Sequence, residues 1–181
     1  DKVTNRHPDY RGTLNVNGGT VRVPRFERWG DAPGGLAYVS LNGGVIQAKA
    51  SEAAFLENMT ATYVYAGGAI FDSAGFDITV NHPLLGPTGD GLASIPVTDG
   101  GSGYMGPPIV NLTGGGGSGA TAVAIMADDG LGAGTYKVDS VLITCPGRDF
   151  TSAPTVTLSG GLPATAATLG TPTLGPVTSG G

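Results

Sequence analysis

The stretch that decides the fold is LNVNGGTV at residues 14–21, which returns as VSLNGGVI at residues 39–46 and, more loosely, as YVYAGGAI at residues 63–70. The glycine pairs of the three copies begin at Gly18, Gly43 and Gly67, so the copies are almost evenly spaced. A period of this length is typical of one coil of a β-solenoid, in which stacked neighbours bury the face that one coil leaves open. The sequence therefore predicts parallel β-solenoid coils in the N-terminal half.

The coil model makes specific predictions for single residues. Alternate side chains of a strand point to opposite faces, so Leu14 and Val16 should both point inward. Stacking in register should place Val16, Leu41 and Tyr65 in one ladder, and the apolar run at residues 76–80 should supply the next strand.

A second repeat occupies the C-terminal half, at a constant offset of 46 in residue number. The offset relates three pairs of residues: Tyr104 to Phe150, Pro108 to Pro154 and Leu112 to Leu158. Proline at the first position of a strand removes no ladder bond, and glycine-rich turns separate the apolar runs. The pattern predicts two three-stranded β-repeat units, at about residues 95–126 and 141–170, each paired antiparallel within itself.

The fold class expected is therefore all-β throughout. We expect a solenoid-like segment at residues 1–88, then residues 89–181 with the two glycine-rich units and a C-terminal strand. A hinge is expected near residues 83–91, where proline and glycine cluster. Helical sequence is confined to residues 48–59, which predict one short helix or an irregular corner.

Composition excludes several classes of protein. The chain has 33 Gly and 13 Pro, yet 40% of its residues are hydrophobic and only 13% are charged, so it should fold. A net charge of −5 opposes nucleic-acid binding, and no apolar run is long enough to span a membrane. The start at Asp1, with a strand-like pattern soon after it, suggests a mature or excised chain, and secretion is inferred from that.

Charge is distributed unevenly along the chain. Residues 1–50 hold seven Lys/Arg and four acids, a net +3, whereas residues 51–181 hold two Lys/Arg and ten acids, a net −8. Solvated faces that collect charge for solubility would explain the asymmetry. The alternative is a basic head that meets the acidic tail of the next copy, for which the candidate contact residues are Arg22, Arg25 and Arg28.

Candidate chemistry is sparse. The pairs Asp72/Asp77 and Asp128/Asp129 have the residue types of an acid/base pair, but both border glycine turns, where Asp is common for its own local hydrogen bonds. No nucleophile motif accompanies the two histidines. We therefore expect no enzyme and no catalytic residues.

Binding sites are equally few. No metal or cofactor site is expected, with Ca²⁺ as an alternative for the carboxylates of the acidic half, namely Asp99, Asp128, Asp129 and Asp139. Cys145 stands alone and is expected to be buried, with an intermolecular disulfide as the alternative. Trp29, in a predicted loop insertion at residues 24–35, is the candidate for glycan contact.

The motifs LNGGVIQA, ENMTATYVYAGGAIFDSAGFDITV and HPLLGPTG, within residues 39–89, resemble bacterial autotransporter-associated β-strand repeat proteins. The GGSGY and LTGGGGSGATA motifs that follow are similar to modules found there and in phage tail fibres. The resemblance implies a cell-surface β-solenoid stalk and assigns no catalytic residues.

Together these observations predict a structural subunit of an extracellular bacterial filament, stalk or surface layer. Such a subunit would be a homo-oligomer or homopolymer that assembles head-to-tail through β-strand edges. The alternative is an adhesin or fibre segment that binds surface glycans.

Overall fold

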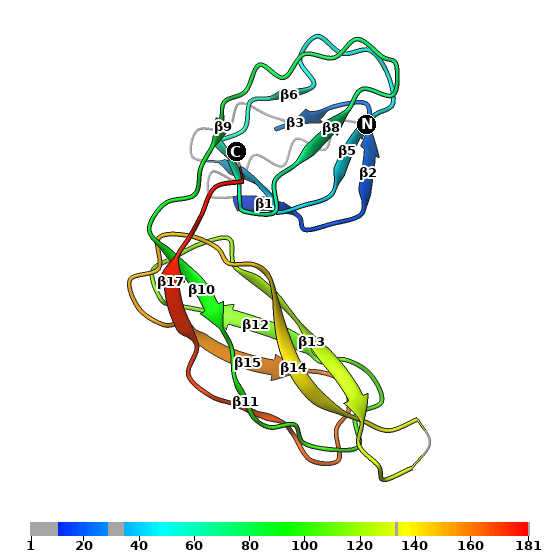
Figure 1. Cartoon of the computed structure of the whole chain (residues 1–181), viewed down its shortest axis with the longest axis vertical. Coiled ribbons are helices and arrows are strands. Elements are labelled where there is room, and N and C mark those ends of the chain that lie inside the picture. Colours follow the sequence, from blue (N-terminus) through cyan, green and yellow to red (C-terminus); the bar gives the residue numbers. More distant parts are fainter. Residues whose placement is uncertain (1–10, 29–34, 133, 181) are drawn as a thin grey trace. The chain divides into compact units, whose positions relative to one another are not determined.

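The computed structural model describes residues 11–28, 35–132 and 134–180 (Figure 1). Within these residues it contains β-strands and no α-helix, which confirms the predicted all-β class. The chain divides into two compact units. Unit 1 comprises residues 1–87 with 178–181, and unit 2 comprises residues 88–177.

The described residues of unit 1 form three parallel sheets. The largest has the order β1-β4-β7-β9, the second β2-β5-β8 and the third β3-β6. Their bounds are β1 (Arg11–Val16), β2 (Thr20–Val23), β3 (Phe26–Glu27), β4 (Leu36–Leu41), β5 (Val45–Ala48), β6 (Leu56–Glu57), β7 (Ala61–Val64), β8 (Ile70–Asp72) and β9 (Leu84–Leu85). Successive strands along the chain thus lie in successive sheets, and each sheet collects every third strand from β1 to β8.

The register of the largest sheet follows the sequence repeat. Leu14 lies opposite Val39, at the interval that separates Gly18 from Gly43, whereas Val39 lies opposite Thr62, at a shorter interval. Val16 lies opposite Leu41, as predicted, but Leu41 lies opposite Val64, so the prediction of Tyr65 in that ladder is wrong by one residue. The cause is the shorter step between β4 and β7.

Three further local predictions for unit 1 can be compared with the structure. The Leu14 side chain is 40% exposed and Val16 is buried, because β1 is an edge strand and only its end lies over the core. Residues 76–80 form no strand, and Ile78 makes only an isolated parallel bridge to Glu52. Residues 48–59 contain no helix, so the irregular corner is correct there, with β6 inside it.

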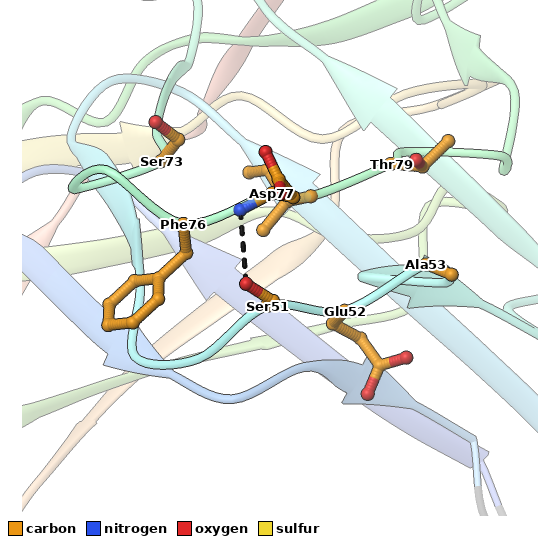
Figure 2. Close-up of a pocket in the computed structure, with 8 residues that line it drawn as sticks. Ser51, Glu52, Ala53, Ser73, Phe76, Asp77 and Thr79 are labelled. Carbon is orange, nitrogen blue, oxygen red and sulfur yellow. Dashed lines mark hydrogen bonds between the residues drawn. The ribbon is translucent and has the colours of Figure 1, made fainter.

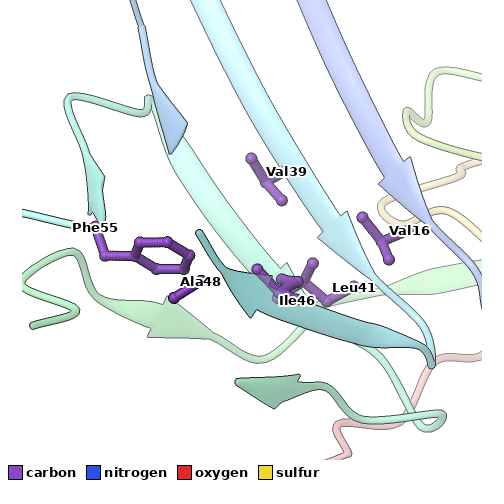
Figure 3. Close-up of a cluster of buried hydrophobic side chains, with 6 residues drawn as sticks. All are labelled: Val16, Val39, Leu41, Ile46, Ala48 and Phe55. Atoms are coloured by element: carbon purple, nitrogen blue, oxygen red, sulfur yellow. The ribbon is translucent and has the colours of Figure 1, made fainter. Parts of the chain in front are cut away.

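The core of unit 1 lies between the sheets (Figure 3). Buried apolar side chains come from the first two copies of the repeat and the corner after β5: Val16, Val39, Leu41, Ile46, Ala48 and Phe55. The Phe55 ring packs edge-on against Phe26, with 6.2 Å between ring centroids. Burying such a set of side chains contributes about 1.5–3 kcal/mol for each large one, which is the main stabilising term of a stack this small.

Unit 2 is a nested antiparallel structure. Its strands are β10 (Asp90–Ser94), β11 (Val97–Asp99), β12 (Ile109–Thr113), β13 (Thr121–Asp128), β14 (Tyr136–Cys145), β15 (Thr155–Ser159), β16 (Thr168–Leu169) and β17 (Thr173–Pro176). The first pairs with the last, β10 with β17, and the nesting continues inward through β11-β16 and β12-β15 to β13-β14. The chain therefore runs out along the unit and returns beside itself (Figure 1).

The predicted pairing within each repeat unit is wrong, because the ladders formed by β11 to β16 join one repeat to the other, and β10 pairs with β17 outside both units. The glycine segments that were expected to turn the chain back instead lie beside the opposite repeat and are hydrogen-bonded to it. Ser102 bridges Thr165, and Ser118 bridges Arg148. A Cβ at Gly101 would meet the backbone of residues 165–167, so glycine permits this close approach of the two repeats.

The two repeats are related by a local pseudo-two-fold axis. Asn111 lies opposite Thr157, its own equivalent in the second repeat, so the axis passes between these two residues. Backbone hydrogen bonds repeat under the same relation. Tyr104 N donates to Tyr136 O and Phe150 N to Asp90 O, both at 2.9 Å.

The core of unit 2 obeys the same symmetry. Tyr104 and Phe150 occupy equivalent positions and are buried, at 1% and 7% exposed. Each ring rests on a glycine of the opposite repeat, Gly161 under Tyr104 and Gly115 under Phe150, where a Cβ would approach the ring to 2.7 Å and 2.8 Å. An aromatic ring of each repeat thus packs into the space left open by a glycine of the other repeat.

Candidate functional site

The three arginines predicted to make a subunit contact lie on or beside the first strands of unit 1, in different environments. Arg25 forms an ion pair with Glu27 at 2.7 Å and lies 3.8 Å from Glu52. Arg28 is half-buried and donates to the Gly35 carbonyl oxygen at 2.6 Å. Arg22 is exposed on β2, and within the described part of the chain no ion pair or side-chain hydrogen bond engages it. Of the three arginines, Arg22 is thus the one whose side chain no described residue holds in an ion pair or hydrogen bond.

Arg22 belongs to a ladder that crosses the whole β2-β5-β8 sheet. It lies opposite Gln47, which lies opposite Asp72, so the three side chains share one face of the sheet. Gln47 Nε2 donates to Asp72 Oδ2 at 2.7 Å. The sheet thus has a cation on one edge strand, an anion on the other and a neutral amide between them.

The charge of Asp72 is held by its surroundings. The hydrogen bond from the Gln47 side chain, and after it that from the Ala74 backbone N–H at 2.8 Å, lower the pKa of Asp72 below its ordinary value. Both interactions favour the ionised form. Asp72 therefore carries its negative charge at neutral pH, at the edge of the sheet opposite to Arg22.

At the end of the largest sheet remote from β1, strand β9 covers part of the edge of β7. It pairs with β7 through two residues only, Thr62 with Leu84 and Tyr63 with Leu85. Ser179 adds a bridge to Tyr65 beside it. The neighbouring sheet ends at β8, and Ile70 on that strand is 60% exposed.

The first acid/base candidate, Asp72/Asp77, is not brought together as a catalytic pair. The Asp72 carboxylate is bonded to Gln47 and to its own turn, whereas the Asp77 backbone N–H donates to Ser51 Oγ at 3.2 Å. Asp77 lines an open hollow of about 610 Å³ together with Glu52 and Phe76 (Figure 2). The Glu52 carboxylate points away from Asp77 in this view, so the two acids do not converge on one point.

The second candidate, Asp128/Asp129, lies at the loop between β13 and β14. Asp128 Oδ1 accepts from the Gly130 N–H at 2.7 Å, which is a local turn bond. Asp129 accepts from three donors: Leu131 N–H at 2.9 Å, Gly103 N–H at 2.7 Å and Thr135 Oγ1 at 2.8 Å. The backbone bond from Leu131, followed by that from Gly103, lowers the pKa of Asp129. These bonds occupy the carboxylate and tie the loop together.

The remaining candidates are Trp29, Cys145 and the carboxylates considered for Ca²⁺. Trp29 lies outside the described residues, next in sequence to Arg28, which lines a hollow of about 430 Å³ with Tyr38 and Met59. Cys145 is buried, as predicted. In residues 11–28, 35–132 and 134–180, no three His, Cys, Asp or Glu side chains are grouped closely enough to hold a metal ion, and Asp99 Oδ1 is bonded to Gly101 N–H.

Sequence reasoning found Arg22 but missed its relation to Asp72. The signal was present, because Arg22, Gln47 and Asp72 are evenly spaced, at the interval that separates Gly18 from Gly43. The sequence pattern drew attention to Asp72 only as half of an acid pair. A search for charge at this interval would have identified the ladder.

Comparison with known proteins adds no relative to this picture. No helix in the described part of the chain has the length and apolar character needed to cross a membrane. The chain matches no protein-family model, no curated protein and no solved structure.

Proposed function

We propose that the protein is a structural subunit of an extracellular bacterial filament, stalk or surface layer, and that it assembles head-to-tail through strand edges of unit 1. In this proposal unit 1 is a short parallel β-solenoid, as the resemblance to autotransporter-associated repeats implies, and the protein has no catalytic role. The observation that carries the proposal is the Arg22–Gln47–Asp72 ladder, with opposite charges on the two edge strands of one sheet.

Stacking a second copy in register would continue this ladder. The β2 strand of the incoming copy would lie against β8, as β5 lies against β2 within the chain, and would set its Arg22 opposite Asp72. Neighbouring parallel strands lie about 4.8 Å apart, so the two charges would be close enough to attract. Unpaired strand edges are templates for pairing with another chain.

The incoming β1 would have to take the place of β9. Strand β9 has two pairs with β7, whereas β1 makes six pairs with β4 inside the chain. Residues 179–180, bonded at residues 64–65, would move with β9. The longer incoming strand offers more ladder bonds than the short one it displaces, which favours the exchange.

Charge reversal tests the proposal directly. Wild-type protein should form uniform fibres by negative-stain electron microscopy and light scattering, and high salt should slow their growth. Arg22→Glu should abolish or strongly slow assembly, and Arg22→Glu with Asp72→Arg should restore it. The control Lys49→Glu makes the same change of charge on a middle coil and should assemble normally. A monodisperse monomer at every salt concentration would contradict the proposal.

Locking β9 gives an independent test. Tyr63 and Leu85 are register partners, so cysteines at both positions can form a disulfide that holds β9 in place. The oxidised double variant should not assemble, and reduction should restore assembly. Tyr63→Cys alone is the control. Assembly of the oxidised form at the wild-type rate would exclude displacement of β9.

A further inference from the structure

The nested pairing of unit 2 makes its two halves exchangeable between molecules. Residues 88–128 hold β10 to β13 and residues 136–177 hold β14 to β17, and all four ladders run from one half to the other. Among the described residues, neither half contains a ladder of its own. Each half therefore depends on a partner, and the structure does not require that partner to be in the same chain.

The pseudo-two-fold axis adds to this dependence. The Val138 N–H donates to Gly100 O at 2.9 Å, and its equivalent Leu92 N–H donates to Pro146 O at 2.8 Å. Such reciprocal bonding is the pattern of an isologous dimer interface, in which residue i contacts j and j contacts i. Here the interface lies within one chain, between two repeats.

We propose that unit 2 can form a strand-exchanged dimer, in which residues 136–177 of one copy pair with residues 88–128 of a second copy. The partner is thus a second copy of this chain. Every ladder of unit 2 would be remade between the two molecules, and the new conformation would be confined to the loop between β13 and β14. Exchange of an identical element is a low-cost route to dimers for this reason.

The loop is the hinge of this exchange, and Asp129 is its clasp. Of the three groups that donate to Asp129, two lie in the loop itself, Leu131 N–H and Thr135 Oγ1. The bond from Thr135, six residues away, exists only when the loop turns back, whereas the bond from Leu131 is a local turn bond. Gly130 and Gly134 also have φ angles of +75° and +84°, which an extended hinge would not need.

The exchanged segment carries the end of the chain with it. Residues 178–181 belong to unit 1, where Ser179 bridges Tyr65. In the dimer this bridge would form with unit 1 of the second copy. The exchange therefore links two molecules at two places and does not use the β2 and β8 edges on which the proposed filament depends.

Cysteine pairing between chains tests the exchange on the full-length protein. Asn111 and Thr157 are register partners at the axis, so the variants Asn111→Cys and Thr157→Cys can be linked only where residue 111 faces residue 157. The two variants are unfolded, mixed and refolded together over a range of concentrations, then oxidised. We expect a disulfide-linked dimer whose yield rises with protein concentration. Asn111→Cys refolded with itself is the control and should give no linked dimer, because residue 111 does not face its own copy.

Hinge variants give a second measurement. A Cβ at Gly130, Gly132 or Gly134 meets no atom within 4 Å, so substitution there does not disturb packing. The double variant Gly130→Val with Gly134→Val strains the closed loop. It should raise the association constant of the dimer about tenfold or more, measured by analytical ultracentrifugation. Gly132→Val, without a positive φ, should leave it unchanged. The proposal is overturned if the mixed cysteine variants yield no more linked dimer than the control, or if the double valine variant remains a folded monomer.

Discussion

The two units use similar glycine-rich repeats in opposite ways. In unit 1 each copy pairs in parallel with the next copy along the chain, so the sheets grow by addition. In unit 2 two copies pair antiparallel about an axis, so the structure is closed once both are present. The difference shows that a repeat in the sequence does not by itself determine which segment each copy pairs with. The direction of pairing decides whether the structure can continue.

The largest effect is expected where the two repeats of unit 2 touch through glycine. A Cβ at Gly101 or at its equivalent Gly147 would meet the backbone of the opposite repeat, and both have positive φ angles, +64° and +70°. Valine at either position should lower the free energy of unfolding by about 3–4 kcal/mol, since strain and overpacking add. Urea denaturation measures it, with Gly106→Val, in open space, as control. Very unequal losses at the two sites would break the pseudo-two-fold comparison.

Next in size is a contrast between the middle and the edge of unit 1. Leu41 on β4 is fully buried, whereas Leu14 on the edge strand β1 is 40% exposed. Leu41→Ala should cost about 3 kcal/mol of stability and Leu14→Ala less than about 1 kcal/mol. Thermal unfolding of the two variants measures the difference. Equal losses would show that β1 is covered as fully as a middle strand, contrary to a stack that is open at this edge.

A smaller effect should distinguish the packing sites of Tyr104 and Phe150 in unit 2. The Tyr104 hydroxyl accepts the Ala167 N–H at 2.9 Å, a bond that its equivalent Phe150 cannot make. Tyr104→Phe should therefore cost about 1 kcal/mol and leave packing intact. Tyr136→Phe, at a half-exposed ring, is the control and should be neutral. If Tyr104→Phe left the free energy of unfolding unchanged, the two aromatic packing sites would be equivalent in energy as well as in position.

How far the sequence leads differs between the units for a physical reason. In unit 1 the repeat length equals one step of the chain from sheet to sheet and back, so it predicted Val16 opposite Leu41. The prediction for Tyr65 failed, because the shorter step between β4 and β7 shifts the register of that ladder and leaves the amino-acid composition almost unchanged. In unit 2 the constant offset identified equivalent residues, but apolar strands of the same kind satisfy pairing within a repeat and between repeats equally well.

The candidate site divides in the same way. The basic cluster with Arg22 was visible as an excess of positive charge at residues 1–50. The role of Asp72 was not, because its meaning depends on which edge of the sheet it lies on. The two bonds that lower the pKa of Asp129 most come from the backbone N–H groups of Leu131 and Gly103, and backbone donors leave no trace in a sequence.

The smallest effect expected is a pH-dependent loosening of one end of unit 2. Asp129 accepts the Gly103 N–H, whereas the equivalent N–H, that of Asp149, donates to the uncharged Thr88 O at 3.1 Å. Because the folded pKa of Asp129 is lowered, its contribution to stability is present above the unfolded pKa of about 3.9 and is lost as the pH falls through the folded value. Acid should therefore speed amide exchange at Gly103 more than at Asp149, measured by hydrogen exchange with NMR. Asp129→Asn removes this carboxylate and should make the ratio of the two protection factors, in which each rate is corrected for the intrinsic exchange of its residue, independent of pH. If the ratio still changed with pH in this variant, the difference between the Gly103 and Asp149 amides would have to come from another charge. The two ends of unit 2 would then differ by more than the Asp129 hydrogen bond.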